Sequence, residues 1–346
     1  MESEISAGFN MGKEEEKRTA SLCIPSSCIG PTVCRSQQQA THIAHQIARA
    51  AIYYQISEIV IYDVPVAEPK SQAETGKKKV FFEEEEKKTD TGPKSSTEAL
   101  ELAKLLQFFI TPSYLRKAVF GDLKSLHYAK KLPKLPGLPF MNHEKSRFLE
   151  GFAVEGRIGK KKKKGLKSKK QLALESMSHY INVGGKKIIK LSDGQKVPLH
   201  SRVTVDTEKN KVVSPAEAYN TEGSGWKNTT FGYTVRLATT FGKTFVESPY
   251  TNGYSYTAYA PCEEFLDSPN HPYETIKSID PHNLSNPTHL LLIFGKWADL
   301  AYSVENDQAD LQEVQDPALL FDARLNISSN IRLEDAILIS LAKIQN

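Results

Sequence analysis

The chain changes from one secondary-structure pattern to another and back, and this order restricts its fold more than any other feature. Residues 19–25 and 57–63 are apolar runs of strand length, and residues 37–55 between them carry apolar side chains at helical spacing. Strand, helix and strand in this order predict a parallel α/β unit. From residue 145 to 236 the pattern becomes glycine-rich turns and short β-branched runs, which predicts a small all-β module. We therefore expect an α/β domain that is interrupted by a β insertion.

The remaining elements complete the α/β domain. A helix is expected from Ser96 to Thr111, because Ser96 or Thr97 can cap its start and Pro112 follows its end. From about residue 232 the chain returns to mixed α/β character. Two strands and a last helix are predicted there, at 289–295, 318–322 and 331–344.

Composition sets the boundaries of these parts. The N-terminal tail is rich in Glu and Lys with little apolar surface, and a later loop consists of Lys and Glu blocks. The predicted organisation is a disordered tail (1–17), the first part of the α/β domain (18–140, with a flexible loop at 65–95), the inserted basic barrel (141–231) and the second part of the α/β domain (232–346).

Several classes of protein are excluded by what the sequence lacks. No run approaches the roughly 20 apolar residues of a membrane helix, and the charged N-terminus is unlike a signal peptide. The four cysteines form no CxxC pair, which argues against a zinc site or a disulfide framework. We expect a soluble intracellular protein with no metal and no membrane partner.

Charge is unevenly distributed along the chain. The net charge is only +4, yet residues 141–200 hold 15 Lys and Arg against 5 Asp and Glu, a balance of +10. Residues 261–346 hold 5 against 14, a balance of −9. The basic middle part is therefore expected to face a polyanion.

A lysine cluster accounts for most of this basic charge. It lies inside the β module, and small barrels of the OB type bind nucleic acid across a strand face and its loops. A nuclear-import signal and a solvated loop are the alternatives. The predicted RNA-binding residues are Lys160, Lys161, Lys162, Lys163, Lys164, Lys167, Lys169 and Lys170.

Two glycines mark possible ligand sites. Gly242 belongs to Thr240–Thr244, which has the ending of a phosphate-binding loop, but Leu237 stands where that motif needs its first glycine, so nucleotide hydrolysis is not favoured. Gly295 ends the apolar strand at 289–295. Because glycine lets a ligand approach the backbone, and ligands of open α/β sheets bind at the carboxyl ends of strands, this position is a candidate site.

The last helix is apolar around most of its circumference. It begins after a polar segment in which Ser329 or Asn330 can cap it, and Glu334 and Asp335 favour its first turn. Such a helix needs a cover on more than one side. Either a homodimer interface or burial within one subunit would provide it.

Four sequence blocks, taken together, resemble one family. These blocks are Tyr114–Phe120, Phe231–Ala238, Leu292–Gly295 and Asn330–Leu341. In this order they resemble the SPOUT (α/β-knot) RNA methyltransferases, and most closely the branch with a β-barrel inserted in the knotted domain. The resemblance implies S-adenosyl-L-methionine as methyl donor, a C-terminal trefoil knot, RNA as acceptor and a homodimer.

The same resemblance implies a set of site residues. The family binds its cofactor mainly through backbone groups of three loops, with adenine between apolar residues such as Ile293, Ile331 and Leu333. Arg332 is the candidate catalytic residue, placed to hold an RNA phosphate or orient the acceptor, or else paired with Asp335 or Asp322. The implied cofactor-binding positions are Tyr259, Ala260, Pro261, Ile293, Phe294, Gly295, Lys296, Asn326, Ile327, Asn330, Ile331 and Leu333.

One block departs from the family pattern. Relatives tend to have Thr-Ser-Glu-Arg-Gly where this chain has residues 260–264, Ala-Pro-Cys-Glu-Glu. A methyltransferase acting on RNA, ribosomal RNA included, is the first hypothesis. A catalytically weak RNA-binding or ribosome-assembly factor and a DNA-binding architectural protein are the alternatives. The lysine cluster favours a nuclear or nucleolar location, with the cytoplasm as the other compartment.

Overall fold

The computed structural model describes most of the chain. The ranges are 19–65, 95–121, 124–135, 137–141, 146–155, 177–185, 187–192, 194–214, 217–218, 232–265, 271–284, 288–307, 309–314 and 316–345. The predicted tail, nearly all of the predicted loop at 65–95 and the whole lysine cluster lie outside the described residues.

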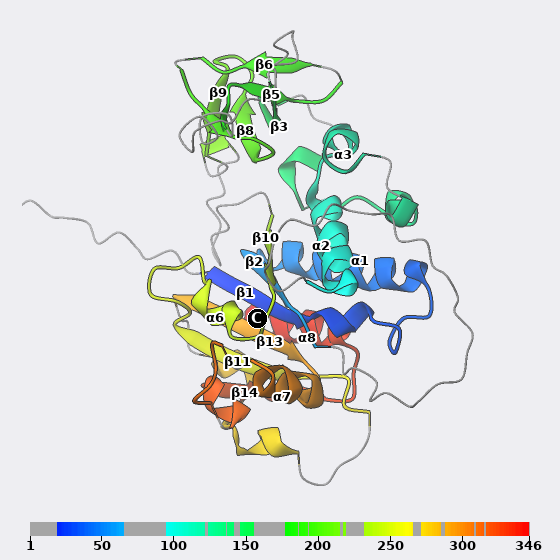
Figure 1. The fold of residues 1–346 in the computed structure, drawn as a ribbon, viewed down its shortest axis with the longest axis vertical. Helices are drawn as coiled ribbons and strands as arrows, with labels where there is room; N and C mark the ends of the chain where they lie inside the picture. Colours follow the sequence, from blue (N-terminus) through cyan, green and yellow to red (C-terminus); the bar gives the residue numbers. More distant parts are fainter. Residues whose placement is uncertain are drawn as a thin grey trace, which may run out of the picture.

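A seven-stranded parallel sheet forms the centre of the α/β domain (Figure 1). Its strands follow the order β10-β2-β1-β13-β11-β14-β12, and every pairing is parallel. The bounds are β1 Thr19–Pro25, β2 Glu58–Tyr62, β10 Thr234–Ala238, β11 Tyr256–Pro261, β12 Ser278–Ile279, β13 His289–Gly295 and β14 Ala323–Leu325. The strands predicted at 19–25, 57–63 and 289–295 are thereby confirmed.

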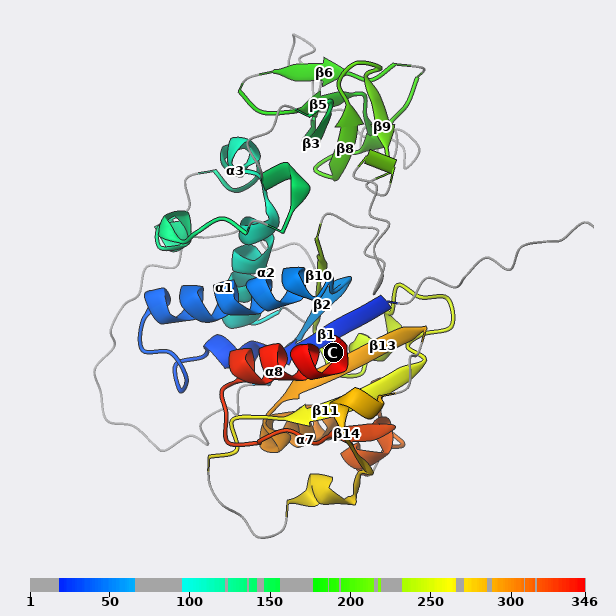
Figure 2. The same ribbon diagram turned by 180° about the vertical axis from the view of Figure 1, so that it is seen from behind.

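Helices cover both faces of this sheet. One face packs against α1 (Gln37–Tyr53), α2 (Thr97–Ile110) and α8 (Leu333–Gln345), and the view from behind shows α1 and α8 in front of the strands (Figure 2). The other face packs against α7 (Trp297–Glu305) and the short α6 (Lys243–Val246). The alternation of side chains along each strand explains the two cores, because successive residues point to opposite faces.

Serine side chains cap both α1 and α2, and the cap of α2 at Ser96 was predicted. The Ser36 hydroxyl accepts a hydrogen bond from the Gln39 amide, and the Ser96 hydroxyl accepts one from Ala99 at 3.1 Å. Such caps satisfy amides that no helical carbonyl can reach. Pro112 follows α2 and starts the next helix, α3 (Ser113–Phe120).

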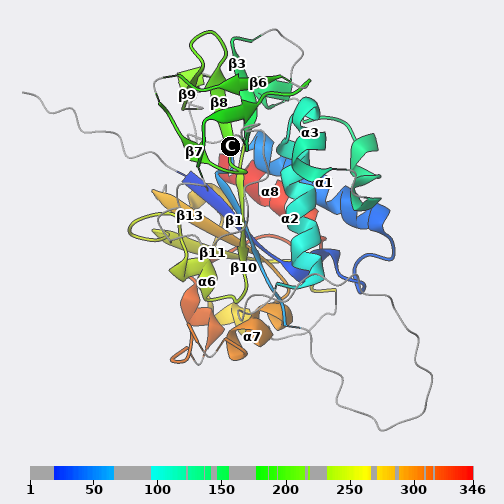
Figure 3. The same ribbon diagram turned by 45° about the horizontal axis from the view of Figure 1, so that its top comes forward.

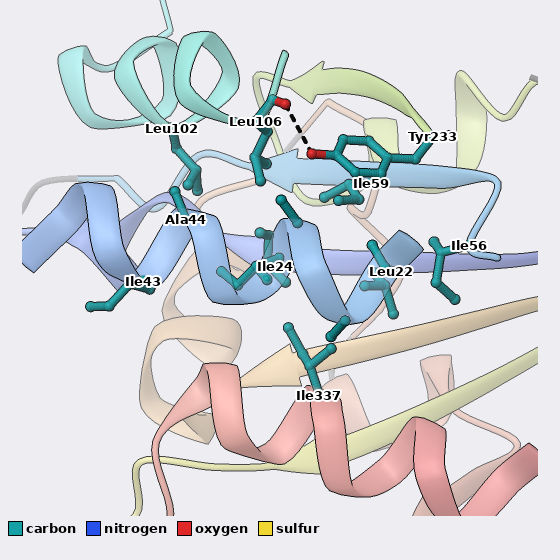
Figure 4. Close-up of a cluster of buried hydrophobic side chains, with 14 of the residues drawn as sticks. Leu22, Ile24, Ile43, Ala44, Ile56, Ile59, Leu102, Leu106, Tyr233 and Ile337 are labelled. Carbon is teal, nitrogen blue, oxygen red and sulfur yellow. Dashed lines mark hydrogen bonds between the residues drawn. The ribbon is translucent and has the colours of Figure 1, made fainter. Parts of the chain in front are cut away.

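Figure 4 shows the core between α1, α2, α8 and the sheet. Leu22 and Ile24 of β1 lie with Ile59 of β2, and Leu106 of α2 packs from above. The Tyr233 hydroxyl donates to the Leu106 carbonyl over 2.9 Å, so this buried polar group is satisfied. Burial of each aliphatic side chain contributes about 1.5–3 kcal/mol, which makes this layer the main support of the domain.

The β insertion is a separate antiparallel half-barrel, and Figure 3 shows it from above. Its sheet has the order β6-β5-β3-β8-β9, and a small pair, β4-β7, lies beside it. The bounds are β3 Phe148–Val154, β4 Met177–Ser178, β5 Tyr180–Asn182, β6 Ile188–Lys190, β7 Val197–Pro198, β8 Arg202–Asp206 and β9 Lys211–Val213. The predicted all-β module is therefore confirmed.

Contacts with α2 and α3 fix the module on the α/β domain. The Tyr114 hydroxyl of α3 accepts a hydrogen bond from the Glu150 amide (3.1 Å), and Arg202 donates to the carbonyl of Ile110 (2.9 Å). Gly184 has φ +92°, and a Cβ there would lie 2.6 Å from the Tyr114 ring. Only glycine therefore lets this turn approach Tyr114 so closely.

Two predictions near the C-terminus need correction. Residues 318–322 are not a strand: Pro317–Leu320 is a 3-10 helix, and β14 begins only at Ala323. The apolar run was misleading because Leu319 is 79% exposed and packs into neither core. The last helix, predicted at 331–344, starts two residues later at Leu333.

The other short turns connect these elements. The further 3-10 helices are Ser26–Ile29, Lys124–Leu126, Ala129–Lys131, Pro139–Met141, Pro272–Thr275 and Pro281–Asn283. No helix within the described ranges is long and apolar enough to cross a membrane.

Candidate active site

The carboxyl edge of the sheet, where its parallel strands end, contains the candidate site. Gly295 ends β13 with φ +146°, a conformation that favours glycine. A Cβ at this position would lie 3.2 Å from Pro25 Cγ and 3.2 Å from the Tyr62 hydroxyl. Pro25 ends β1 and Tyr62 ends β2, so three strand ends meet around one glycine. This is the place where open α/β sheets bind ligands.

The Gly295 carbonyl joins β13 to β11. The Tyr259 hydroxyl donates to this oxygen over 2.9 Å, and the Cys262 amide donates to it over 3.4 Å. The two strands also pair in register, with Tyr259 opposite Ile293 and Pro261 opposite Gly295. Two of the three predicted cofactor segments are therefore neighbours.

The third predicted segment is bound to the end of β11. The Glu263 amide donates to the Ile331 carbonyl over 2.8 Å, and the Glu264 amide donates to the Ser329 carbonyl over 2.9 Å. The Glu264 carboxylate also accepts from the Trp297 amide (2.7 Å), which starts α7. The block that departs from the family pattern thus holds the three segments together through its backbone.

The structure brings the predicted cofactor segments together but not all of their side chains. Tyr259, Ala260, Ile293, Phe294 and Leu333 are fully buried. Ile293 belongs to the core on one face of the sheet and Leu333 to the core on the other, so the two do not flank one space. Exposed or half-buried positions are Lys296, Asn326, Ile327, Asn330 and Ile331.

Arg332 forms an ion pair with Glu334, which the sequence analysis assigned only to the first turn of the last helix. Its Nε donates to Oε1 of Glu334 over 2.8 Å, and neither Asp335 nor Asp322 is its partner. The Asp322 carboxylate instead accepts a hydrogen bond from the Thr257 amide over 2.7 Å. The Arg332 side chain remains 43% exposed, whereas that of Glu334 is 7% exposed. A cation thus lies at the surface over a buried carboxylate.

A second buried carboxylate lies beside this pair. Glu263 has φ +60°, and its carboxylate lies 3.8 Å from Nζ of Lys296. Burial raises the pKa of Glu263 above its ordinary value, and the charges of Lys296 and Arg332 partly oppose this increase. The site therefore combines two cations with two carboxylates at the ends of β11, β13 and β14.

Two buried polar atoms at the site have no hydrogen-bond partner among the described residues. They are the Tyr62 hydroxyl, which faces Gly295, and Oε2 of Glu334. Unpaired buried polar atoms are rare and costly in folded proteins. The unpaired Tyr62 hydroxyl beside the end of β13 makes this edge suitable for a polar organic cofactor, which the residues present would fit.

The cysteines are not candidates for nucleophilic chemistry. Cys23, Cys28, Cys34 and Cys262 are all buried and free. Burial raises the pKa of every one of these thiols, that of Cys23 to about 12, so they stay protonated. The residues with described positions include no cluster of His, Cys, Asp and Glu that could bind a metal ion.

The segment Thr240–Thr244, which resembles the end of a phosphate-binding loop, is hydrogen-bonded to another part of the chain. The Gly242 amide donates to the Asp307 carboxylate over 2.7 Å. A Cβ on Gly242 would lie 2.6 Å from Asp310 and 2.7 Å from Asp307. The position that a phosphate would occupy is therefore taken by the chain's own carboxylate.

The arginines of the other family blocks also have structural partners. Arg236 pairs with the buried Glu58 over 2.7 Å and donates to the Tyr254 hydroxyl over 2.9 Å. Arg116 donates to the Thr111 carbonyl, and its guanidinium lies 4.1 Å from the centre of the Phe108 ring. Both arginines therefore stabilise the fold.

A cavity of about 590 Å³ opens next to Arg332 and Glu334. Its other walls come from the start of α1 and from the 3-10 helix Ala129–Lys131 with its neighbours. Among its lining residues, sequence reasoning named only Arg332 as a candidate site residue. The wall from α1 gave no signal, because Gln38, Gln39 and His42 look like an ordinary solvated helix start.

The fold and this edge define an α/β protein with a candidate ligand site at strand ends and an inserted β module. The sequence model of a family described as "Putative RNA methyltransferase" matches residues 19–344. The chain therefore belongs to this family, and the RNA methyltransferase resemblance found in the four sequence blocks is confirmed.

Curated proteins give the same assignment. A putative methyltransferase of Saccharomyces cerevisiae is 35% identical over 94% of this chain and 93% of its own length. The 28S rRNA (uridine-N(3))-methyltransferase of Homo sapiens is 30% identical over 96% of this chain and 80% of its own length. The Mus musculus enzyme of that name is 31% identical over 94% of this chain and 76% of its own length.

Proposed function

We propose that this protein transfers a methyl group from S-adenosyl-L-methionine to N3 of a uridine in the RNA of the large ribosomal subunit. The observation that carries the proposal is the similarity to 28S rRNA (uridine-N(3))-methyltransferases along nearly the whole chain. The three joined segments around Gly295 support it, because their hydrogen bonds bring them to one edge of the sheet, where the buried Tyr62 hydroxyl is unpaired.

The chain's own residues would divide the work as follows. Backbone groups at Pro261, Gly295 and Ile331 hold the cofactor, which when bound supplies an electrophilic methyl group. Arg332, at the surface of the site, attracts the RNA backbone. The protein thus contributes mainly alignment of acceptor and donor.

Finer features of the proposal come from the family resemblance. The C-terminal segments form a SPOUT trefoil knot, and the half-barrel is an OB-like RNA-binding module whose lysine cluster (Lys160–Lys164, Lys167, Lys169, Lys170) contacts phosphates. The protein is a homodimer that works in the nucleus or nucleolus. The outward side of α8 supports the dimer, since Ile339 there is 39% exposed although the helix also packs inside the subunit.

The experiment is a methylation assay with a product analysis. Ribosomal RNA from cells that lack the protein is incubated with purified protein and the methyl donor, digested to nucleosides and analysed by mass spectrometry. We expect 3-methyluridine to appear, and to disappear when the donor is left out. Calorimetry with S-adenosylhomocysteine provides a binding readout that does not depend on turnover.

The alternative of a catalytically weak RNA-binding factor predicts another result. RNA would bind to the protein. Calorimetry would detect no binding of S-adenosylhomocysteine at millimolar concentration, and the assay would detect no methyl transfer to any nucleoside. That pair of results would overturn the proposed function. Methylation at another atom or base would correct only the acceptor.

A further inference from the structure

The cavity beside Arg332 has walls that match the chemistry of a nucleotide. Tyr128 is 36% exposed and offers an aromatic face, and Lys131 Nζ lies 5.8 Å from the centre of its ring. Arg332 provides a second cation across the cavity. Unstacked bases bind to aromatic side chains, and their phosphates bind to cations. The volume of about 590 Å³ lies within the range of small-ligand sites.

Glu334 provides an independent sign of a ligand. It lines the cavity, its side chain is only 7% exposed, and its Oε1 accepts from Arg332 over 2.8 Å. Its Oε2 is buried without a hydrogen-bond partner in the described part of the chain. A carboxylate oxygen in this state lacks a donor, because buried polar atoms are normally hydrogen-bonded.

The missing donor can be deduced from the bases themselves. On the pairing edge, uracil and guanine carry a ring N–H, whereas cytosine and adenine carry an unprotonated ring nitrogen. A carboxylate oxygen accepts from the former and repels the latter, since it has no proton to donate. A ring N–H, which the acceptor of the proposed reaction has at N3, donates to Oε2 without a repelled atom beside it, whereas the amino groups of cytosine and adenine can donate only next to an unprotonated ring nitrogen that the carboxylate repels.

We infer that the cavity between Tyr128 and Arg332 receives the acceptor nucleotide and that Oε2 of Glu334 accepts the ring N–H of its base. This inference rests on the proposed function. When RNA binds, the Arg332 guanidinium turns from Glu334 to a phosphate and uncovers Oε2. During the reaction the N3 proton moves to Oε2, and the N3 electron pair forms the bond to the methyl carbon. The bond from that carbon to the sulfonium sulfur breaks, and its electrons stay on sulfur.

The test compares three short RNAs on the whole protein. Single-stranded oligonucleotides with one central uridine, 3-methyluridine or cytidine are titrated by fluorescence anisotropy, with S-adenosylhomocysteine present so that no transfer occurs. We expect the uridine RNA to bind about tenfold more tightly than the other two, the effect of one hydrogen bond to a charged group. Equal affinity for all three RNAs would overturn the inference without any variant.

Two matched variants assign this preference to Glu334. Glu334→Gln keeps the side-chain volume and removes the charge, so we expect the preference for uridine to fall to about twofold and single-turnover methylation to fall about 100-fold or more. Asp335→Asn changes the adjacent, exposed carboxylate and should retain both properties. A Glu334→Gln protein with the wild-type preference and rate would refute the assignment.

Failure of this inference is distinguishable from failure of the proposed function. If ribosomal RNA is methylated but the three oligonucleotides bind equally, only the cavity assignment is wrong. If neither binding of S-adenosylhomocysteine nor methylation is detected while the preference for the uridine RNA persists, the proposed function is wrong and the assignment of the nucleotide site stands.

Discussion

Replacement of Gly295 by alanine tests the cofactor edge most directly. The φ of +146° lies in a region where side chains are strained, at a cost of about 1–3 kcal/mol. The new Cβ also lies 3.2 Å from Pro25 Cγ and from the Tyr62 hydroxyl, so the ends of β1 and β2 must move by a few tenths of an ångström. We expect Gly295→Ala to lower the free energy of unfolding by about 2–3 kcal/mol and to weaken S-adenosylhomocysteine binding at least about tenfold.

Gly253→Ala is the matched control. Gly253 also has a positive φ, +70°, but a Cβ there meets nothing within 4 Å and lies outside the site. Its cost should be about 1 kcal/mol, with normal ligand binding. Urea unfolding followed by tryptophan fluorescence, to which Trp297 contributes, gives the stabilities, and calorimetry gives the affinities. The argument fails if Gly295→Ala matches Gly253→Ala in both measurements.

Three further predictions concern buried polar groups. Tyr62→Phe removes an unpaired hydroxyl, so a urea titration should show a free energy of unfolding that is higher by up to about 1 kcal/mol. Calorimetry should show weaker binding of S-adenosylhomocysteine. A loss of stability would contradict this prediction. Arg236→Met leaves Glu58 buried without its cation and should cost about 3 kcal/mol by the same titration, and a cost below about 1 kcal/mol would show that the pair is dispensable. Burial raises the pKa of Glu263, so the folded protein binds this proton more tightly than the unfolded chain, and wild-type stability falls as pH rises from 4.5 through the folded pKa. Thermal unfolding of Glu263→Gln should lack this decrease, and parallel pH profiles of the two proteins would refute it.

The parallel core of the fold could be predicted from the sequence because its elements are locally consistent. β1, β2 and β13 are short, mostly apolar runs, and Ser96 caps α2 as predicted. The prediction of a strand at residues 318–322 was wrong for the opposite reason. Five mostly apolar residues show neither the helical nor the strand period. Whether they form a strand or a 3-10 turn depends on whether Leu319 is buried or exposed, and distant residues decide that.

The part of the candidate site that depends on backbone conformation could be predicted from the sequence. A glycine at the end of an apolar strand marks the candidate edge from sequence alone, and the structure places Gly295 at the end of β13. The partner of Arg332 was not predictable, since residues two apart on a helix usually diverge, yet at the start of α8 the chain has not entered the helix and Glu334 lies within reach. The cavity joins Tyr128 to Arg332 across 204 positions, and no local pattern contains that contact.

The attachment of the β module has a consequence for the size of the substrate. The module contacts Ile110 at the end of α2, and the chain leaves it through Gly232 to enter β10 beside the start of β2. Gly295 lies at the other end of β2, next to Tyr62. From Glu58 to Tyr62, β2 alone puts about 13 Å between the two places. A mononucleotide cannot reach from one to the other. If the module binds RNA as proposed, it can therefore increase the affinity of its own subunit's site only for a polymer long enough to span the sheet.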